Sequence, residues 1–159
     1  MIAVQHIHPI LVHFPIVFFL SLAAIDAIAA ARGYVVTGRG TIGNLSSGLA
    51  VLAGGFAIVT YLFGGMALDF AESGGFHSDV AEIHEGLGEF TAIAFAIWAA
   101  IRVFMWWRDL RWTNLRLGRA VSAAVSLVEI AGAGLVVATA YYGGQLVYEL
   151  GVNVSHIAG

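Results

Sequence analysis

Cysteine and lysine are both absent from the 159-residue chain, and charged side chains of any kind are scarce. Without cysteine the protein can form no disulfide, thiolate zinc site, iron–sulfur cluster or covalent c-type haem attachment. Any bound metal must therefore be held by histidine, carboxylate or methionine. Without lysine, and with a formal net charge of −3, the chain has no basic surface of the kind that binds nucleic acid.

Apolar residues dominate what remains. Hydrophobic residues make up 60% of the chain and charged residues only 11%, whereas soluble domains average roughly 25% charged residues. This balance places the protein in a lipid bilayer. The first residues carry no lysine or arginine before the apolar stretch, so a cleaved secretory signal is not predicted and the first helix is expected to stay as an anchor.

Four apolar segments are long enough to cross the roughly 30 Å hydrocarbon core. Helices are the open-ended structures that satisfy the backbone in lipid, so we expect an all-α, integral membrane four-helix bundle. The whole chain, 1–159, is predicted to be one transmembrane domain. The spans cover about 9–31, 42–68, 80–106 and 118–142, and a tail, 143–159, follows.

The arginines are confined to one side of this predicted topology. They follow the first span or flank the connection between the third and fourth spans, and the connection between the second and third spans has none. Cytoplasmic loops carry an excess of arginine and lysine, so both termini are expected to face outward, N-out and C-out. The residues concerned are Arg32, Arg39, Arg102, Arg108, Arg111, Arg116 and Arg119.

The histidines are all predicted on the opposite, outer side. They are His6, His8, His13, His77, His84 and His156. If the first span starts near Pro9 and the third near Asp79, His13 and His84 both lie about 6–8 Å below the helix start. Two imidazoles at equal depth on facing helices can hold a flat macrocycle such as haem from both sides. Gly86 and Gly88 follow His84 and lack side chains where a porphyrin would lie.

Other roles for these histidines stay open. His8 lies five residues before His13 and therefore on another helix face, at the rim of the bundle. Histidines of the outer face, including His77, can also form a copper or zinc site with nearby carboxylates, or serve only as hydrogen-bonded structural groups. Those carboxylates are Asp79, Glu82 and Glu85.

Three further acidic residues fall within the spans. Asp26 lies near the cytoplasmic end, where Arg102 or Arg119 can pair with it. Glu129 lies near mid-bilayer. It is expected to be either protonated and hydrogen-bonded or part of a proton or quinone site, with Glu89 as a second candidate for that role.

Three motifs carry a family resemblance. "HPILVHFPI" at 8–16, "IH" at 83–84 and "GGQLVYELGVNV" at 143–154 resemble a bacterial four-helix membrane family of unknown function, marked by HPxxVHFP and GGxLVYxxGVxV. The family looks like a b-type cytochrome, sometimes associated with c-type cytochromes and periplasmic oxidoreductases. Carried over to this chain, the resemblance implies functional histidines at His8, His13 and His84.

The resemblance bears on the number of haems as well. Tyr141 and Leu150 stand where many members have further histidines. One haem b is therefore expected, and a second would need another histidine, such as His77 or His156.

Taken together, these observations predict a haem b-binding electron-transfer subunit of a larger oxidoreductase complex in the bacterial inner membrane. It would link a periplasmic c-type cytochrome or dehydrogenase to membrane quinone, beside other membrane subunits, and would not be a stand-alone enzyme. The rival predictions are a non-redox anchor or assembly subunit, and an outer-face copper or zinc carrier.

Overall fold

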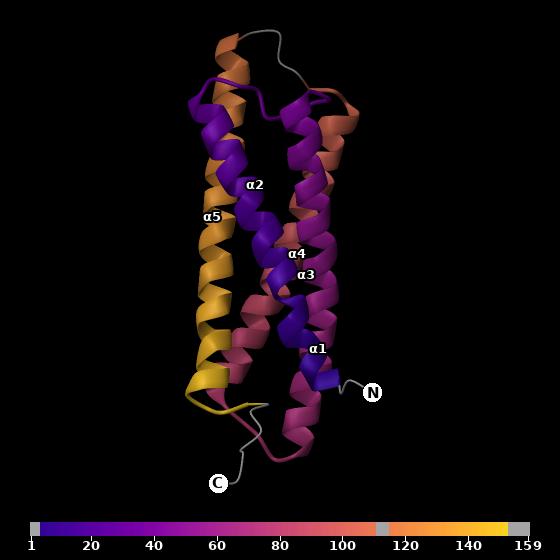
Figure 1. The fold of residues 1–159 in the computed structure, drawn as a ribbon, viewed down its shortest axis with the longest axis vertical. Coiled ribbons are helices and arrows are strands. Elements are labelled where there is room, and N and C mark those ends of the chain that lie inside the picture. Colours follow the sequence, from indigo (N-terminus) through magenta and orange to yellow (C-terminus); the bar gives the residue numbers. More distant parts are fainter. Residues whose placement is uncertain (1–3, 111–114, 153–159) are drawn as a thin grey trace.

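The described chain consists of long helices joined by short connections (Figure 1). The computed structural model describes residues 4–110 and 115–152. The helices are α1 (Val4–Leu11), α2 (His13–Ala31), α3 (Thr41–Ser73), α4 (Asp79–Trp107) and α5 (Leu115–Tyr148). In this described part, α1 with α2, α3, α4 and α5 form four spans long and apolar enough to cross a membrane. The predicted all-α, four-span membrane bundle is confirmed.

Three helix boundaries differ from the sequence prediction by about five residues, and one of them is the end of α3, at Ser73 instead of near residue 68. The first helix begins at Val4, not near Pro9, and is interrupted at Val12. The last helix continues through Gly143 and Gly144 to Tyr148 instead of ending near residue 142. Glycine weakens a helix but does not stop one that packs against its neighbours.

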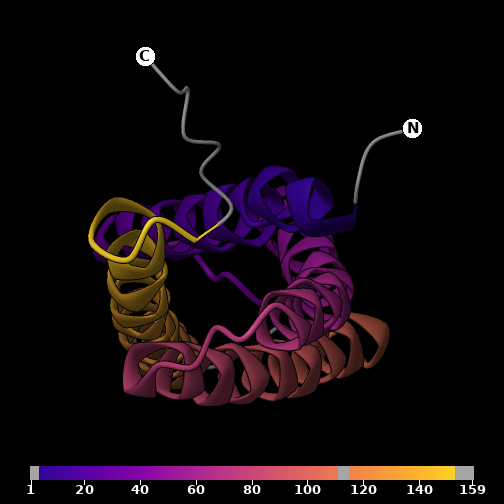
Figure 2. The ribbon, with the colours of Figure 1, turned by 90° about the horizontal axis from the view of Figure 1, so that it is seen from below.

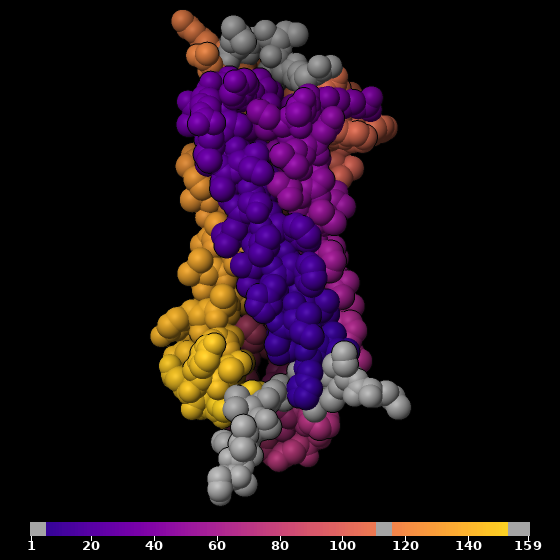
Figure 3. Space-filling model, in the orientation of Figure 1, coloured from indigo at the N-terminus to yellow at the C-terminus, as the bar shows by residue number. Residues whose placement is uncertain are grey.

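The interruption at Val12 follows from Pro15. Proline has no backbone N–H, so it cannot bond the carbonyl four residues earlier, which is that of Leu11. The hydroxyl of Thr60 on α3 donates to the Leu11 carbonyl instead, at 3.2 Å. α1 and α2 therefore form one rod with a one-residue interruption at Val12, and α3 bonds to the rod beside this interruption. Figure 3 shows this rod running obliquely across one face of the molecule.

The spans are arranged in a ring. Seen along the bundle, α2 and α4 are diagonal to each other, as are α3 and α5, and each span packs against the two beside it (Figure 2). The start of α1, the end of α5 and the α3–α4 connection lie at one end, here called the terminal end (Figure 1). The opposite end, with the α2–α3 connection, carries the described arginines of the connections and is called the arginine end. Large apolar side chains cover the outside, as lipid contact requires.

The α2–α3 and α4–α5 hairpins repeat each other. The pattern I-H-x-x-L-x-x-F occurs at 7–14 and at 83–90, and T-x-x-x-G-G occurs at 60–65 and at 139–144. Three pairs of residues separated by the same 76 positions meet across the centre of the ring. They are His8 with His84, Phe19 with Phe95, and Asp26 with Arg102. The bundle therefore has an approximate two-fold axis that runs between α2 and α4.

Candidate functional site

Two histidines meet near the terminal end of the bundle. His8 comes from α1 and His84 from α4, which are diagonal across the ring. Their ring centroids are 6.3 Å apart, and their ring planes make an angle of 77°. Both rings are partly buried. The structure thus brings together two imidazoles that are 76 positions apart in the chain.

Each imidazole is held by the same type of contact. Nδ1 of His8 lies 3.0 Å from the backbone carbonyl oxygen of Thr60, and Nδ1 of His84 lies 3.0 Å from that of Thr139. A carbonyl oxygen can only accept, so Nδ1 must carry the hydrogen in both rings. In the neutral ring Nε2 is then the atom with a free lone pair. Both rings are consequently fixed in the tautomer that a metal ligand needs.

A glycine lies against each ring. A β-carbon added at Gly64 would come within 2.9 Å of His8 Cε1, and one added at Gly143 would come within 2.9 Å of His84 Cε1. Any larger residue at these two positions would push the ring away from its carbonyl partner. The glycines of the repeated T-x-x-x-G-G motif therefore create the space in which the imidazoles lie.

The two rings line a cavity of about 540 Å³. Specific ligand pockets range over roughly 300–1,000 Å³, so this volume is that of a cofactor site. All five helices contribute to its wall, and most of the lining is apolar. The polar groups on the wall include Thr60, Thr91, Thr139 and Glu85.

The structure places His8, and not His13, beside His84. The predicted pairing assumed a helix that starts near Pro9, whereas α1 begins at Val4. His8 is therefore four residues from the start of its helix, and His84 is five residues from the start of α4, so these two histidines have similar depth. His13 lies at the margin of the cavity with an exposed side chain.

The remaining predicted histidines lie elsewhere. His77 is exposed in the α3–α4 connection, before α4, whose first turn is capped by the Ser78 hydroxyl accepting from Val80 N at 3.2 Å. Asp79 is the first helical residue, as predicted. His6 is exposed on α1. His156 lies outside the described residues.

Some of the glycines and carboxylates predicted near His84 line the cavity, and others do not. Gly88 and Glu85 line the cavity, whereas Gly86 is exposed and does not. Asp79 and Glu82 are exposed as well, and so is Glu89. Among residues 4–110 and 115–152, no three histidines or acidic residues converge on one point as a metal cluster would. The carboxylates invoked for a copper or zinc site do not join the histidine pair.

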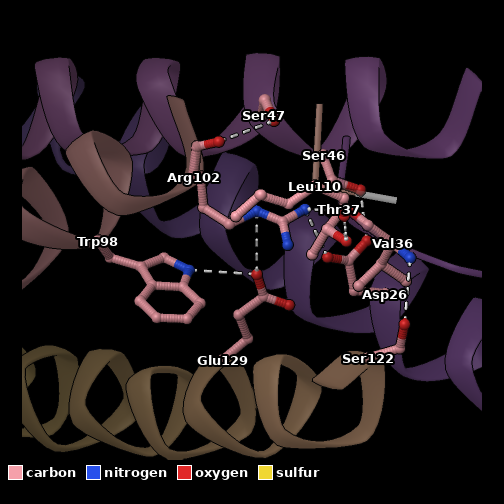
Figure 4. Close-up of polar contacts among 10 residues, drawn as sticks. All are labelled: Asp26, Val36, Thr37, Ser46, Ser47, Trp98, Arg102, Leu110, Ser122 and Glu129. Carbon is pink, nitrogen blue, oxygen red and sulfur yellow. Dashed lines mark hydrogen bonds and ion pairs between the residues drawn. The ribbon is translucent and has the colours of Figure 1, made fainter. Parts of the chain in front are cut away.

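A second polar centre lies toward the arginine end (Figure 4). Arg102 Nη2 lies 2.9 Å from Asp26 Oδ2, so the predicted pairing of Asp26 with Arg102 is confirmed. Arg102 Nε also lies 3.9 Å from Glu129 Oε1. The indole N–H of Trp98 donates to the same glutamate oxygen at 3.1 Å. We call Asp26, Arg102 and Glu129 the buried triad.

The spacing of the histidines in the cavity suits two ligands of one metal. If each imidazole nitrogen lies roughly 2 Å from an ion between the rings, the ring centroids are separated by about 6 Å. The observed 6.3 Å agrees with that separation. The residues present therefore fit a flat macrocycle whose central metal is held by His8 and His84.

The fold and this site define a multi-pass membrane protein with a cavity between paired imidazoles. Residues 5–156 match the family described as predicted membrane protein DUF2231, and the chain belongs to that family. The search of curated proteins found no match, and the search of solved structures found none. The expected resemblance to a four-helix membrane family of unknown function is thus confirmed at the level of the family.

Proposed function

We propose that the protein is a haem b-binding electron-transfer subunit, in which His8 and His84 would hold the haem iron. The observation that carries the proposal is the paired geometry. Two diagonal imidazoles, each with Nδ1 bonded to a backbone carbonyl, border one cavity. A bound haem b supplies a one-electron carrier.

The protein's own residues determine the properties of this site. The carbonyls of Thr60 and Thr139 fix the imidazole orientation and raise ligand basicity by accepting from Nδ1. The apolar wall lowers the local dielectric and restricts water, which tunes a redox potential. With both histidines holding the iron, the group would serve electron transfer and not oxygen binding.

The position of the arginines suggests which end of the bundle faces which side of the membrane. Positively charged loops face the cytoplasm, so the arginine end is assigned to that side and the terminal end to the periplasm. His8 and His84 then lie within reach of a periplasmic redox partner, such as a c-type cytochrome or a dehydrogenase. Quinone or a neighbouring membrane subunit would exchange electrons within the bilayer, so the chain acts as part of a larger complex.

Difference spectra of the purified protein, expressed with ample haem, test this proposal. We expect a b-type α band in the reduced-minus-oxidised spectrum of the unmodified chain. His8→Ala and His84→Ala should each remove the band or shift it to that of a five-coordinate haem. His6→Ala is the matched control, because His6 is exposed on the same helix as His8 and does not line the cavity, and it should keep the band.

The outcome separates the proposal from its rivals. A protein that folds but shows no b-type band, despite ample haem, would be a non-redox anchor or assembly subunit. Copper or zinc at one equivalent, lost in His8→Ala and His84→Ala, would favour the metal carrier. A band that survives both substitutions would mean that other residues hold the haem.

A further inference from the structure

The buried triad places three ionisable groups inside the membrane-spanning part of the bundle. Asp26 comes from α2, Arg102 from α4 and Glu129 from α5, and their side chains are 0%, 1% and 0% exposed. α3 contributes only the hydroxyls of Ser46 and Ser47 to this centre. With every group ionised, two carboxylates and one guanidinium leave a net charge of −1. An uncompensated charge at this depth is costly, and one bound proton removes it.

The contacts of the two carboxylates differ. Asp26 has the short ion pair with Arg102, at 2.9 Å, and also accepts from the Ser46 hydroxyl. Glu129 is 3.9 Å from Arg102, and both this approach and the Trp98 bond involve Oε1. Its other oxygen, Oε2, is buried and has neither a hydrogen bond nor an ion pair among the described residues. Asp26 Oδ2 also lacks a hydrogen bond, but it has the Arg102 guanidinium 2.9 Å away. Asp26 is therefore the better stabilised carboxylate, and Oε2 of Glu129 is the atom that can carry a proton.

Polar groups connect Glu129 to the arginine end. Ser122, Ser126 and Glu129 are spaced by four and three residues on α5, so they share one face of that helix, and all three are buried. Ser122 Oγ accepts from the backbone N–H of Val36 at 3.3 Å, and Arg102 donates to the Val36 carbonyl at 3.0 Å. In this direction the triad adjoins the α2–α3 connection (Figure 4).

On the side of the triad that faces the histidine pair, apolar side chains fill the centre of the bundle. Phe19 and Phe95 stack face to face with centroids 3.7 Å apart, between the triad and the histidine pair. Leu22, Ala53 and Ala57 pack around this stack and are almost fully buried. The Ser126 hydroxyl and Arg102 Nη1 on the triad's side of the stack are buried without hydrogen-bond partners in the described chain. Such groups are normally satisfied by internal water in a polar space.

We propose that Asp26, Arg102 and Glu129 form an internal proton-binding site, which holds one proton on Glu129 and exchanges it with the arginine end. The proton comes from water at that end, binds Glu129 Oε2, and changes the charge of the triad from −1 to 0. Return of the proton to the same side reverses the step. This activity goes beyond electron transfer and does not require that a haem be bound.

Infrared spectroscopy of the full-length protein in lipid nanodiscs tests the proposal directly. At neutral pH the unmodified protein should show the C=O stretch of one protonated carboxylic acid. Glu129→Gln should remove this band completely. Asp26→Asn should also remove it, because Arg102 and Glu129 then balance each other. Glu89→Gln, which changes an exposed glutamate on α4, is the matched control and should leave the band unchanged.

The route of exchange is tested by transferring the sample into D₂O and following the shift of the same band. Ser126→Ala should slow that shift several-fold, whereas Ser21→Ala on α2 should not. Absence of a protonated carboxyl band from the unmodified protein would overturn the proposal, even if no variant folds. A band that persists in Glu129→Gln, or in Asp26→Asn, would overturn it too. Equal exchange rates in the two serine variants would refute access from the arginine end.

Discussion

The glycine beside each imidazole provides a sharp test of the histidine site. We consider Gly143→Ala and Gly64→Ala. Each would place a β-carbon 2.9 Å from a histidine Cε1, whereas carbon atoms pack at about 3.5–4.0 Å. The ring must therefore move by roughly 0.6–1 Å, or the helix must shift by that amount.

A displacement of this size acts on the hydrogen bond to Nδ1. The two bonds are 3.0 Å long, and a further 0.6 Å along the bond would carry them beyond about 3.5 Å, where little of the interaction remains. Loss of such an orienting partner typically reduces metal-site affinity 10- to 100-fold. We expect haem affinity to fall by about that factor in each variant.

Two exposed glycines of the same helices, which do not line the cavity, provide matched controls. A β-carbon at Gly55 on α3 or Gly134 on α5 meets nothing within 4 Å among the described residues. Gly55→Ala and Gly134→Ala make the same change in helix propensity, which favours alanine by roughly 0.5–1 kcal/mol. These variants should keep the haem affinity of the unmodified protein and should unfold at the same or a higher temperature.

The assay is titration of the haem-free protein in detergent with haem, followed by absorbance, with thermal unfolding measured in parallel. Full affinity in Gly143→Ala and Gly64→Ala would refute the reasoning. Equal losses in Gly134→Ala and Gly143→Ala would refute it as well, because the effect would then come from the helix and not from the imidazole.

Two further substitutions test the packing of the bundle. Arg102→Met leaves two buried carboxylates without their cation and should destabilise the fold by about 3–5 kcal/mol. Reversible unfolding in mixed micelles measures this free energy. Arg108→Met, which changes an exposed arginine, is the control and should alter the free energy of unfolding little. Phe95→Ala removes half of the central aromatic stack and leaves a cavity at a residue only 2% exposed, so we expect a loss of about 3 kcal/mol in the same assay. A loss below about 1 kcal/mol in either variant would contradict the packing described.

The membrane spans follow from composition and length alone. Apolar runs of this length have one stable backbone solution in lipid, so helix number and fold class are predictable. The pairing of Asp26 with Arg102 is predictable for a related reason, since a charge in a span needs a partner at the same depth. That Glu129 approaches the same arginine depends on how α4 and α5 pack, which a list of spans does not contain.

The choice of His13 as the partner of His84 shows that estimating depth by counting residues depends on where the helix is assumed to begin. Counting from Pro9 selects His13, whereas the helix begins at Val4 and His8 therefore has the depth that was expected for His13. Thr60 satisfies the Leu11 carbonyl that Pro15 leaves free. The signal that selects His8 is the internal repeat, in which "IHPILVHF" aligns with "IHEGLGEF" and His8 with His84. The glycines at Gly64 and Gly143 recur in the same way, but only the structure shows that they face the imidazoles.

At one position the two halves of the repeat carry opposite charges. The residue equivalent to Asp26 in the second hairpin is Arg102, and the two form an ion pair across the axis. A homodimer of the α2–α3 hairpin would bring two copies of Asp26 face to face in the bilayer with no arginine between them. Like charges buried together oppose assembly, so this hairpin needs the arginine of the α4–α5 hairpin. The two hairpins are therefore complementary, and the α2–α3 hairpin pairs with the other hairpin and not with a second copy of itself. Because both lie in one polypeptide, they are always made in equal number and side by side.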